Sequence, residues 1–102
     1  MIICLIEFQV NPGMEEEQQR WLQTLLPIVD EVPGFIAKES YTHVSGDGRT
    51  NTVSFWENEA SLNEWTRDPR HQEAMAAGRD HIFSEYDIRI CSELRKYGHK
   101  AG

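Results

Sequence analysis

Trp65 and His71 stand on either side of an Asp68-Pro69 pair, and their side chains are suited to chemistry on an aromatic molecule. Asp68 is expected to cap a new helix with Pro69 at its first position, so the preceding helix ends there. Across this break the two side chains could point into one gap. An imidazole can act as a base or an acid near neutral pH, and an indole offers an apolar wall for a flat ring. Alternatively, His71 only hydrogen-bonds a nearby carbonyl at the start of its helix.

The helix after Pro69 carries further candidates on a stripe of mostly small residues: His71, Ala74, Met75, Gly78 and Ile82. Small side chains either let a helix approach the sheet closely or leave room for a ligand. Met75 is the candidate substrate contact on this stripe. Arg79, near the end of the helix, could neutralise an anionic substrate or could complement the partial negative charge of the helix C-terminus.

Two more candidate substrate contacts, Trp56 and Glu7, lie on predicted strands. Val53 and Phe55 alternate with Trp56 along its strand, so they point to the other face of the sheet. If Val53 and Phe55 pack beneath the helices, Trp56 faces the opposite side, where it either packs at a subunit contact or lines a pocket. Glu7 belongs to the odd-numbered residues of the first strand, which are apolar at one end and polar at the other.

Sequence patterns that bind metals or nucleotides are missing. The four histidines, at positions 43, 71, 81 and 99, share no spacing, and there is no H-E-x-x-H, EF-hand loop, P-loop, G-x-G-x-x-G or G-x-S-x-G. We therefore expect no metal and no cofactor. Cys4 and Cys91 form no C-x-x-C, and strand parity places them on opposite faces of one sheet, so two free thiols are expected.

Length and charge limit the kinds of partner. A chain of 102 residues supports one domain, which we assign to residues 1–97, followed by a loose polar tail at 98–102. The net charge of −7 argues against binding nucleic acid or an anionic lipid surface. No apolar run approaches the roughly 18 residues of a membrane span, and the start has no basic n-region. We expect a cytoplasmic protein with no membrane partner.

Hydrophobic periodicity predicts the elements. The expected strands are 2–10, 35–43, 50–56 and 86–94, the middle two joined by a turn at 45–48. A helix capped by Asn11, with Pro12 at its first position, should be interrupted by Pro27 and end at Pro33-Gly34. Its apolar stripe is Met14, Trp21, Leu22, Leu25, Leu26, Val29 and Val32. A helix capped by Asn58 and the helix from Pro69 to about Gly78 or Arg79 complete the chain.

This order, strand-helix-strand-strand-helix-strand, predicts an α+β fold of the ferredoxin-like type. Its four-stranded antiparallel sheet has helices on one face and is bare on the other. A bare face that mixes apolar and polar residues predicts a homodimer that closes sheet on sheet.

Several short motifs resemble the antibiotic biosynthesis monooxygenase (ABM) family of dimeric α+β barrels, and together they cover nearly the whole chain. They are Asn11-Pro12-Gly13 before an acidic helix, Val32-Pro33-Gly34-Phe35, Val53-Ser54-Phe55-Trp56-Glu57, Asn63-Glu64-Trp65, Asp68-Pro69-Arg70-His71, Ala77-Gly78-Arg79 and a strand that opens at Tyr86.

One branch of this family oxidises polycyclic phenols to quinones with dioxygen and without metal or flavin. The resemblance implies that Trp65 and His71 match its Trp and the polar residue that follows, which is a Tyr in some members. His71 would take the phenol proton, the phenolate would pass an electron to dioxygen, and Arg79 would stabilise the anion.

A second branch degrades haem, with an Asn on the first strand and a ligand His ten residues after the helical Trp. Here Met75 follows Trp65 at that spacing, and Ile6-Glu7 occupy the Asn region. We therefore expect a cofactor-independent monooxygenase for a small aromatic, quinol-like molecule. Its catalytic residues would be Trp65, His71 and Arg79, and its substrate contacts Trp56, Met75 and Glu7. A non-enzymatic small-molecule-binding dimer and a haem-binding or haem-degrading protein are the alternatives.

Overall fold

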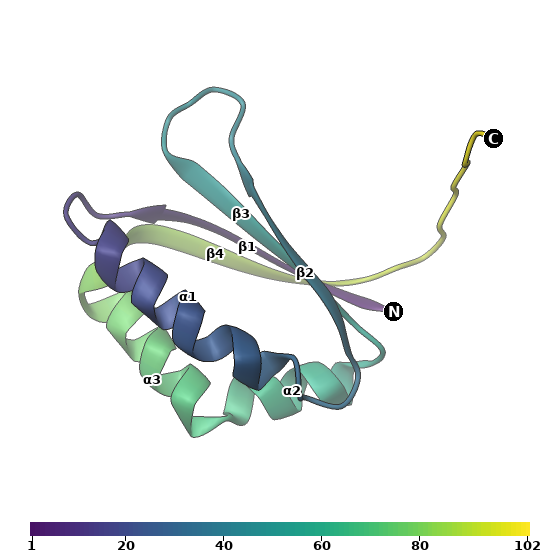
Figure 1. Cartoon of the computed structure of the whole chain (residues 1–102), viewed down its shortest axis with the longest axis horizontal. Coiled ribbons are helices and arrows are strands. Elements are labelled where there is room, and N and C mark those ends of the chain that lie inside the picture. Colours follow the sequence, from purple (N-terminus) through teal and green to yellow (C-terminus); the bar gives the residue numbers. More distant parts are fainter.

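The computed structural model describes all 102 residues and has a four-stranded antiparallel sheet in the order β2-β3-β1-β4. The strands are β1 (Ile2–Val10), β2 (Phe35–Thr42), β3 (Arg49–Trp56) and β4 (Phe83–Ser92). The helices are α1 (Glu15–Val29), α2 (Glu59–Arg67) and α3 (Pro69–Ala77), and a π-helical turn, η1 (Gly78–Ile82), joins α3 to β4. All three helices lie on one face of the sheet (Figure 1). The predicted ferredoxin-like α+β fold is confirmed.

The even-numbered residues of β1 and β3 face the helices. Cys4 lies opposite Ser54 in the register, and both are buried, as are Phe8, Thr52 and Trp56. The core forms where this face meets Val29 of α1 and Leu62 and Trp65 of α2.

The expectation that Trp56 faces away from the helices is therefore wrong. Its side chain is only 1% exposed and packs against Phe35, with ring centroids 5.2 Å apart. Val53 and Phe55, which the expectation placed beneath the helices, lie on the opposite face and are half-buried. Since both parities of β3 carry apolar side chains, periodicity alone did not distinguish the two faces.

The first helix begins three residues later than predicted, at Glu15 in place of Pro12. Asn11, Pro12 and Gly13 form a turn in which the Met14 N–H donates to the Asn11 carbonyl at 3.0 Å, and Gly13 adopts a φ of +90°. The side chain of Asn11 does not cap a helix but donates to the carbonyl of His81 at 3.0 Å. Asn11 thus ties the end of β1 to η1.

Of the predicted stripe, Met14 and Val32 lie outside α1 and Leu26 is 43% exposed, while the other members are buried or half-buried. The helix ends before Pro33-Gly34, the end that was predicted. Pro27 lies within the last turn of α1, which ends at Val29.

The fourth strand starts three residues earlier than predicted, at Phe83, and Leu94 lies beyond its end. None of the helices is both long and apolar enough to cross a membrane.

The face of the sheet without helices is half apolar and half polar. Ile3 and Leu5 of β1 lie beside Phe55 and Val53 of β3 in the register and are half-buried. Further along the strand, Glu7 forms an ion pair with Arg49 at 3.2 Å. Cys91 lies opposite Ile3, so the two thiols are on different faces and both are free, as predicted.

Candidate functional site

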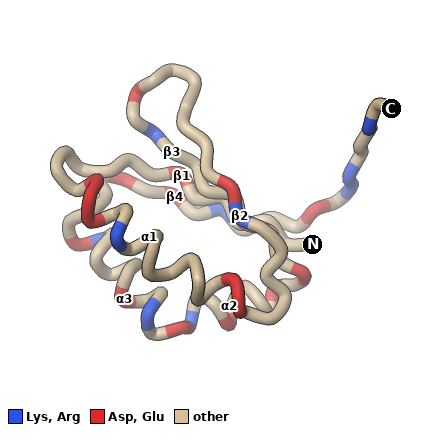
Figure 2. The backbone as a smooth tube through the Cα atoms, viewed as in Figure 1, with Lys and Arg blue, Asp and Glu red and all other residues tan.

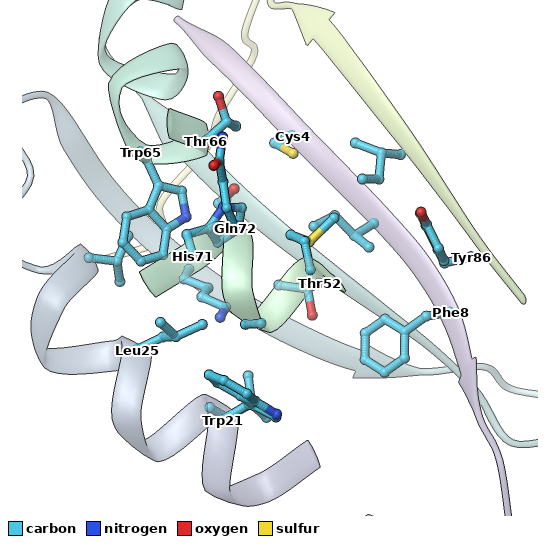
Figure 3. A pocket seen from close by; sticks show the side chains of 18 of the residues that line it. Cys4, Phe8, Trp21, Leu25, Thr52, Trp65, Thr66, His71, Gln72 and Tyr86 are labelled. Atoms are coloured by element: carbon cyan, nitrogen blue, oxygen red, sulfur yellow. The ribbon is translucent and has the colours of Figure 1, made fainter. Parts of the chain in front are cut away.

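A cavity of about 690 Å³ lies between the helix-facing side of the sheet and the three helices. Figure 3 shows Trp65, His71 and Gln72 on one side of it, with Phe8 and Tyr86 of the sheet across from them and Trp21 and Leu25 of α1 closing another side. Most of its lining is apolar. A mostly apolar cleft of several hundred Å³ with a few polar groups is typical of small-molecule sites.

The break between α2 and α3 positions Trp65 and His71. The side chain of Asp68 accepts a hydrogen bond from the Arg70 N–H at 2.8 Å, and Pro69 follows as the first residue of α3. Because the helix axis changes direction here, the indole and the imidazole meet in the cavity with their centroids 4.6 Å apart. The structure therefore brings the two predicted residues into contact.

His71 is held as a neutral imidazole. Burial lowers the pKa of His71, and the charge of Lys38 adds to this, whereas the Thr66 carbonyl and Asp68 act in the other direction. Its Nδ1 is buried and has no hydrogen-bond partner. The Nδ1 atom therefore faces the protein interior, and the rest of the His71 ring lines the cavity.

Asp68 does not serve as an orienting carboxylate for the imidazole. Arg70 donates to it from Nε at 3.1 Å and from Nη2 at 2.9 Å. These hydrogen bonds lower the pKa of Asp68 to about 2. Asp68 is therefore engaged with Arg70 and its helix cap.

The helix-facing side of the sheet carries a few polar side chains. The indole N–H of Trp56 donates to Ser54 Oγ at 2.9 Å, and the hydroxyls of Ser40 and Thr52 lie 3.2 Å apart. Burial raises the pKa of the Cys4 thiol, so the thiol form is favoured. Since the N–H of Trp56 already has an acceptor, its ring is left to line the cavity as an apolar surface.

Comparison with known proteins identifies the family. Residues 1–77 match the family model described as Antibiotic biosynthesis monooxygenase. The chain belongs to the ABM family. It is 28% identical over 90 residues to "Jasmonate monooxygenase ABM" of Pyricularia oryzae, an alignment that covers 88% of this chain and 42% of that protein. The chain thus spans less than half the length of this relative. YqjZ of Bacillus subtilis is 28% identical over 96 residues, which cover 94% of this chain and 79% of YqjZ.

Solved structures from other organisms share the fold. The N63A mutant of SnoaB, a cofactor-independent oxygenase of Streptomyces nogalater, superposes with a TM-score of 0.79 at 12% identity. The superposition covers 96% of this chain and 97% of SnoaB. A conserved protein from Methanosarcina mazei gives a TM-score of 0.78 at 20% identity, covering 88% and 89% of the two chains. At these identities the likeness concerns the fold.

Five of the six site residues predicted from this ABM sequence lie around this cavity: Trp56, Trp65, His71, Met75 and Arg79. Glu7 does not. Its side chain points to the opposite face of the sheet, where it pairs with Arg49. The prediction that Glu7 contacts the substrate conflicts with this placement, because even-numbered residues of β1 face the cavity.

Lys38 and Tyr86 line the cavity but were not among the predicted site residues. Lys38 lies opposite Ser54 in the sheet register, so it shares the helix-facing side with Trp56. Sequence alternation could have assigned the side chain of Lys38 to the cavity only if the helix-facing side of β3 had been known, because Lys38 pairs with Ser54 of that strand. No group of three His, Cys, Asp or Glu side chains is arranged to hold a metal ion.

Proposed function

We propose that this ABM-family protein is a monooxygenase that needs no cofactor and oxidises a small phenolic or quinol-like aromatic molecule bound in the cavity. The observation that carries the proposal is the partly buried imidazole of His71, which packs against the Trp65 ring in the lining of a cavity of ligand size. The family and the fold shared with a cofactor-independent oxygenase support it.

In the proposed reaction, His71 takes the proton of the substrate hydroxyl. The electron-rich phenolate then transfers an electron to dioxygen, and the two radicals combine at a ring carbon. The peroxide anion takes back the proton held by His71, and the resulting hydroperoxide loses water together with the hydrogen of that ring carbon to give the quinone carbonyl. One oxygen atom enters the product and the other leaves as water, so the substrate supplies all four electrons and no other reductant is required.

The surrounding residues would serve this step in different ways. The indole of Trp65 would hold the substrate ring against the imidazole, and Trp56 and Met75 would bound the ring on other sides. Arg79, which has no carboxylate partner, would stabilise negative charge as it forms.

We also propose that the protein works as a homodimer. Ile3, Leu5, Val53 and Phe55 form a contiguous apolar area on the face of the sheet without helices. A two-fold, sheet-on-sheet contact would remove this area from water, as expected for an isologous interface.

A second candidate function is binding of a small aromatic metabolite without turnover. The observation in its favour is that His71 has no carboxylate to orient it, since Asp68 is engaged by Arg70. Catalytic bases commonly have such a third group.

Oxygen consumption separates the two functions. Purified protein should consume dioxygen with members of an anthrone and hydroquinone panel, and His71→Ala should lower the rate by about 10²–10⁴-fold. His99→Ala, in the tail, is the matched control and should leave the rate unchanged. Binding of panel members without oxygen uptake would favour the second function, and equal turnover by His71→Ala would remove His71 from the reaction.

A further inference from the structure

The cavity lining differs in charge from the rest of the molecule. The chain has 17 acidic and 10 basic residues, and its acids are spread over helices, strands and loops (Figure 2). No Asp or Glu lines the cavity, whereas Lys38 and Arg79 do. The cavity is therefore an electropositive space inside an acidic protein.

Neither cation of the cavity has a partner within the protein. Arg49 pairs with Asp47 and Glu7, and Arg70 pairs with Asp68, but neither of these arginines lines the cavity. Lys38 and Arg79 form no ion pair and donate no hydrogen bond to another protein group. An unpaired cation in a partly desolvated site gains from a ligand that carries the opposite charge.

Lys38 is the more buried of the two cations. It lies on β2 opposite Ser54, on the same side of the sheet as Trp56, and its charge acts on His71. Burial lowers the pKa of Lys38, as expected for an ammonium group that has lost water without gaining an anion. Arg79 is exposed and lies in η1, directly after the end of α3.

We propose that the cavity selects an aromatic molecule that carries a carboxylate, and that Lys38 binds this carboxylate. A carboxylate is already ionised at neutral pH, so it can pair with Lys38 before any proton moves to His71. This inference rests on the proposed function for the location of the substrate and adds its chemical class. Lys38 then acts as a specificity-determining residue and leaves the Trp65 and His71 side of the cavity to the reacting ring.

The test compares 2-naphthoate with 2-naphthamide, which share one ring system and differ in charge. All three Trp of the chain, at positions 21, 56 and 65, line the cavity, so quenching of their fluorescence reports binding there. Wild-type protein should bind the naphthoate about tenfold or more tightly than the amide. Lys38→Met should abolish this preference by weakening naphthoate binding alone, and Lys38→Arg should restore it.

Lys100→Met is the matched control, because it changes the net charge equally but lies in the polar tail. It should keep the preference for naphthoate. Thermal unfolding of each variant checks folding, and Lys38→Arg provides a second variant should Lys38→Met fold poorly. Equal binding of both probes by wild type would overturn the inference. A preference that persists in Lys38→Met but disappears in Arg79→Gln would also overturn it, since the anion would then bind at Arg79.

The two proposals fail in distinguishable ways. Equal binding of naphthoate and naphthamide leaves oxygen consumption with neutral hydroquinones intact, so only the carboxylate inference is overturned. Absence of binding by either probe overturns both the carboxylate inference and the role of the cavity as an aromatic site.

Discussion

The indole of Trp65 and the imidazole of His71 lie with their ring centroids 4.6 Å apart and their planes tilted by 40°, although the residues belong to different helices. The contact depends on the helix break, because an uninterrupted helix would place residues six apart about 120° from each other around its axis and about 9 Å apart along it. Asp68 and Pro69 create this break by capping and starting α3. The helix cap and the proline therefore position the candidate base, His71, against the ring of Trp65.

The activity should depend on pH through the protonation of His71. Its pKa is lowered from 6.5, with burial as the main cause and Lys38, Asp68 and the Thr66 carbonyl as the other nearby groups. The base form should therefore persist below pH 6.5, and the acid limb of kcat/KM should have its midpoint below that value. Titration of the His71 ring protons by NMR should give the same low midpoint. A midpoint above 6.5 would contradict the buried, neutral imidazole.

The same lowered pKa makes a prediction for stability. Unfolded His71 binds its proton at a higher pH than folded His71, so unfolding takes up a proton between the two pKa values. The contribution of His71 to the free energy of unfolding should therefore rise with pH through this window, which lies below about pH 6.5. Urea unfolding across this range should show a smaller pH slope for His71→Ala than for wild type. An equal slope in the two proteins would mean that His71 is accessible to water.

Trp56 should contribute strongly to the free energy of unfolding, although it is the last residue of β3. It is 1% exposed, and its N–H donates to Ser54. Trp56→Ala should lower the free energy of unfolding by about 3–5 kcal/mol. Trp56→Phe keeps most of the buried ring but leaves Ser54 without this donor, and should cost about 1–3 kcal/mol. Trp21→Phe, at a half-buried position, is the control and should cost less than Trp56→Phe in the same urea experiment.

Gly78 should not tolerate a methyl group. Its backbone is helical, with φ of −59°, so alanine would ordinarily stabilise the segment. However, a Cβ at this position would lie 2.7 Å from Cε2 of Phe83. Gly78→Ala should therefore destabilise the protein by about 1–3 kcal/mol.

Two further variants test the cause of this effect. Gly98→Ala, in the tail, has nothing within 4 Å of the new methyl and should be neutral. Phe83→Leu should reduce the cost of Gly78→Ala in a double-mutant cycle. Additive effects of the two substitutions would show that contact with Phe83 is not the reason.

The dimer proposal makes a prediction for the apolar face of the sheet. Val53→Lys places a charge among Leu5, Ile3 and Phe55, while the helix-facing core is left unchanged. Sedimentation velocity should show a dimer for wild type and a folded monomer for Val53→Lys. Val44→Lys introduces the same charge at a residue that is 99% exposed and should remain dimeric. A monomeric wild-type protein at working concentrations would end the dimer proposal.

The sequence by itself determined the order of elements, the helix break and the fold. These features are encoded locally, in the alternation of β1, the Asn58 and Asp68 caps, and Pro69. Each of these signals spans only a few residues, so no knowledge of distant contacts was needed. The grouping of Trp65, His71, Met75 and Arg79 followed from the same local features.

Only the tertiary structure decided which face of the sheet lines the cavity. Both β1 and β3 carry apolar residues on both faces, so a period of two did not say which set the helices cover. Packing placed Trp56 in the core, left Glu7 on the opposite face and brought Lys38 of β2 into the same cavity as the candidate base. The charge of the cavity therefore depends on strand pairing between distant segments, which the order of residues along the chain does not display.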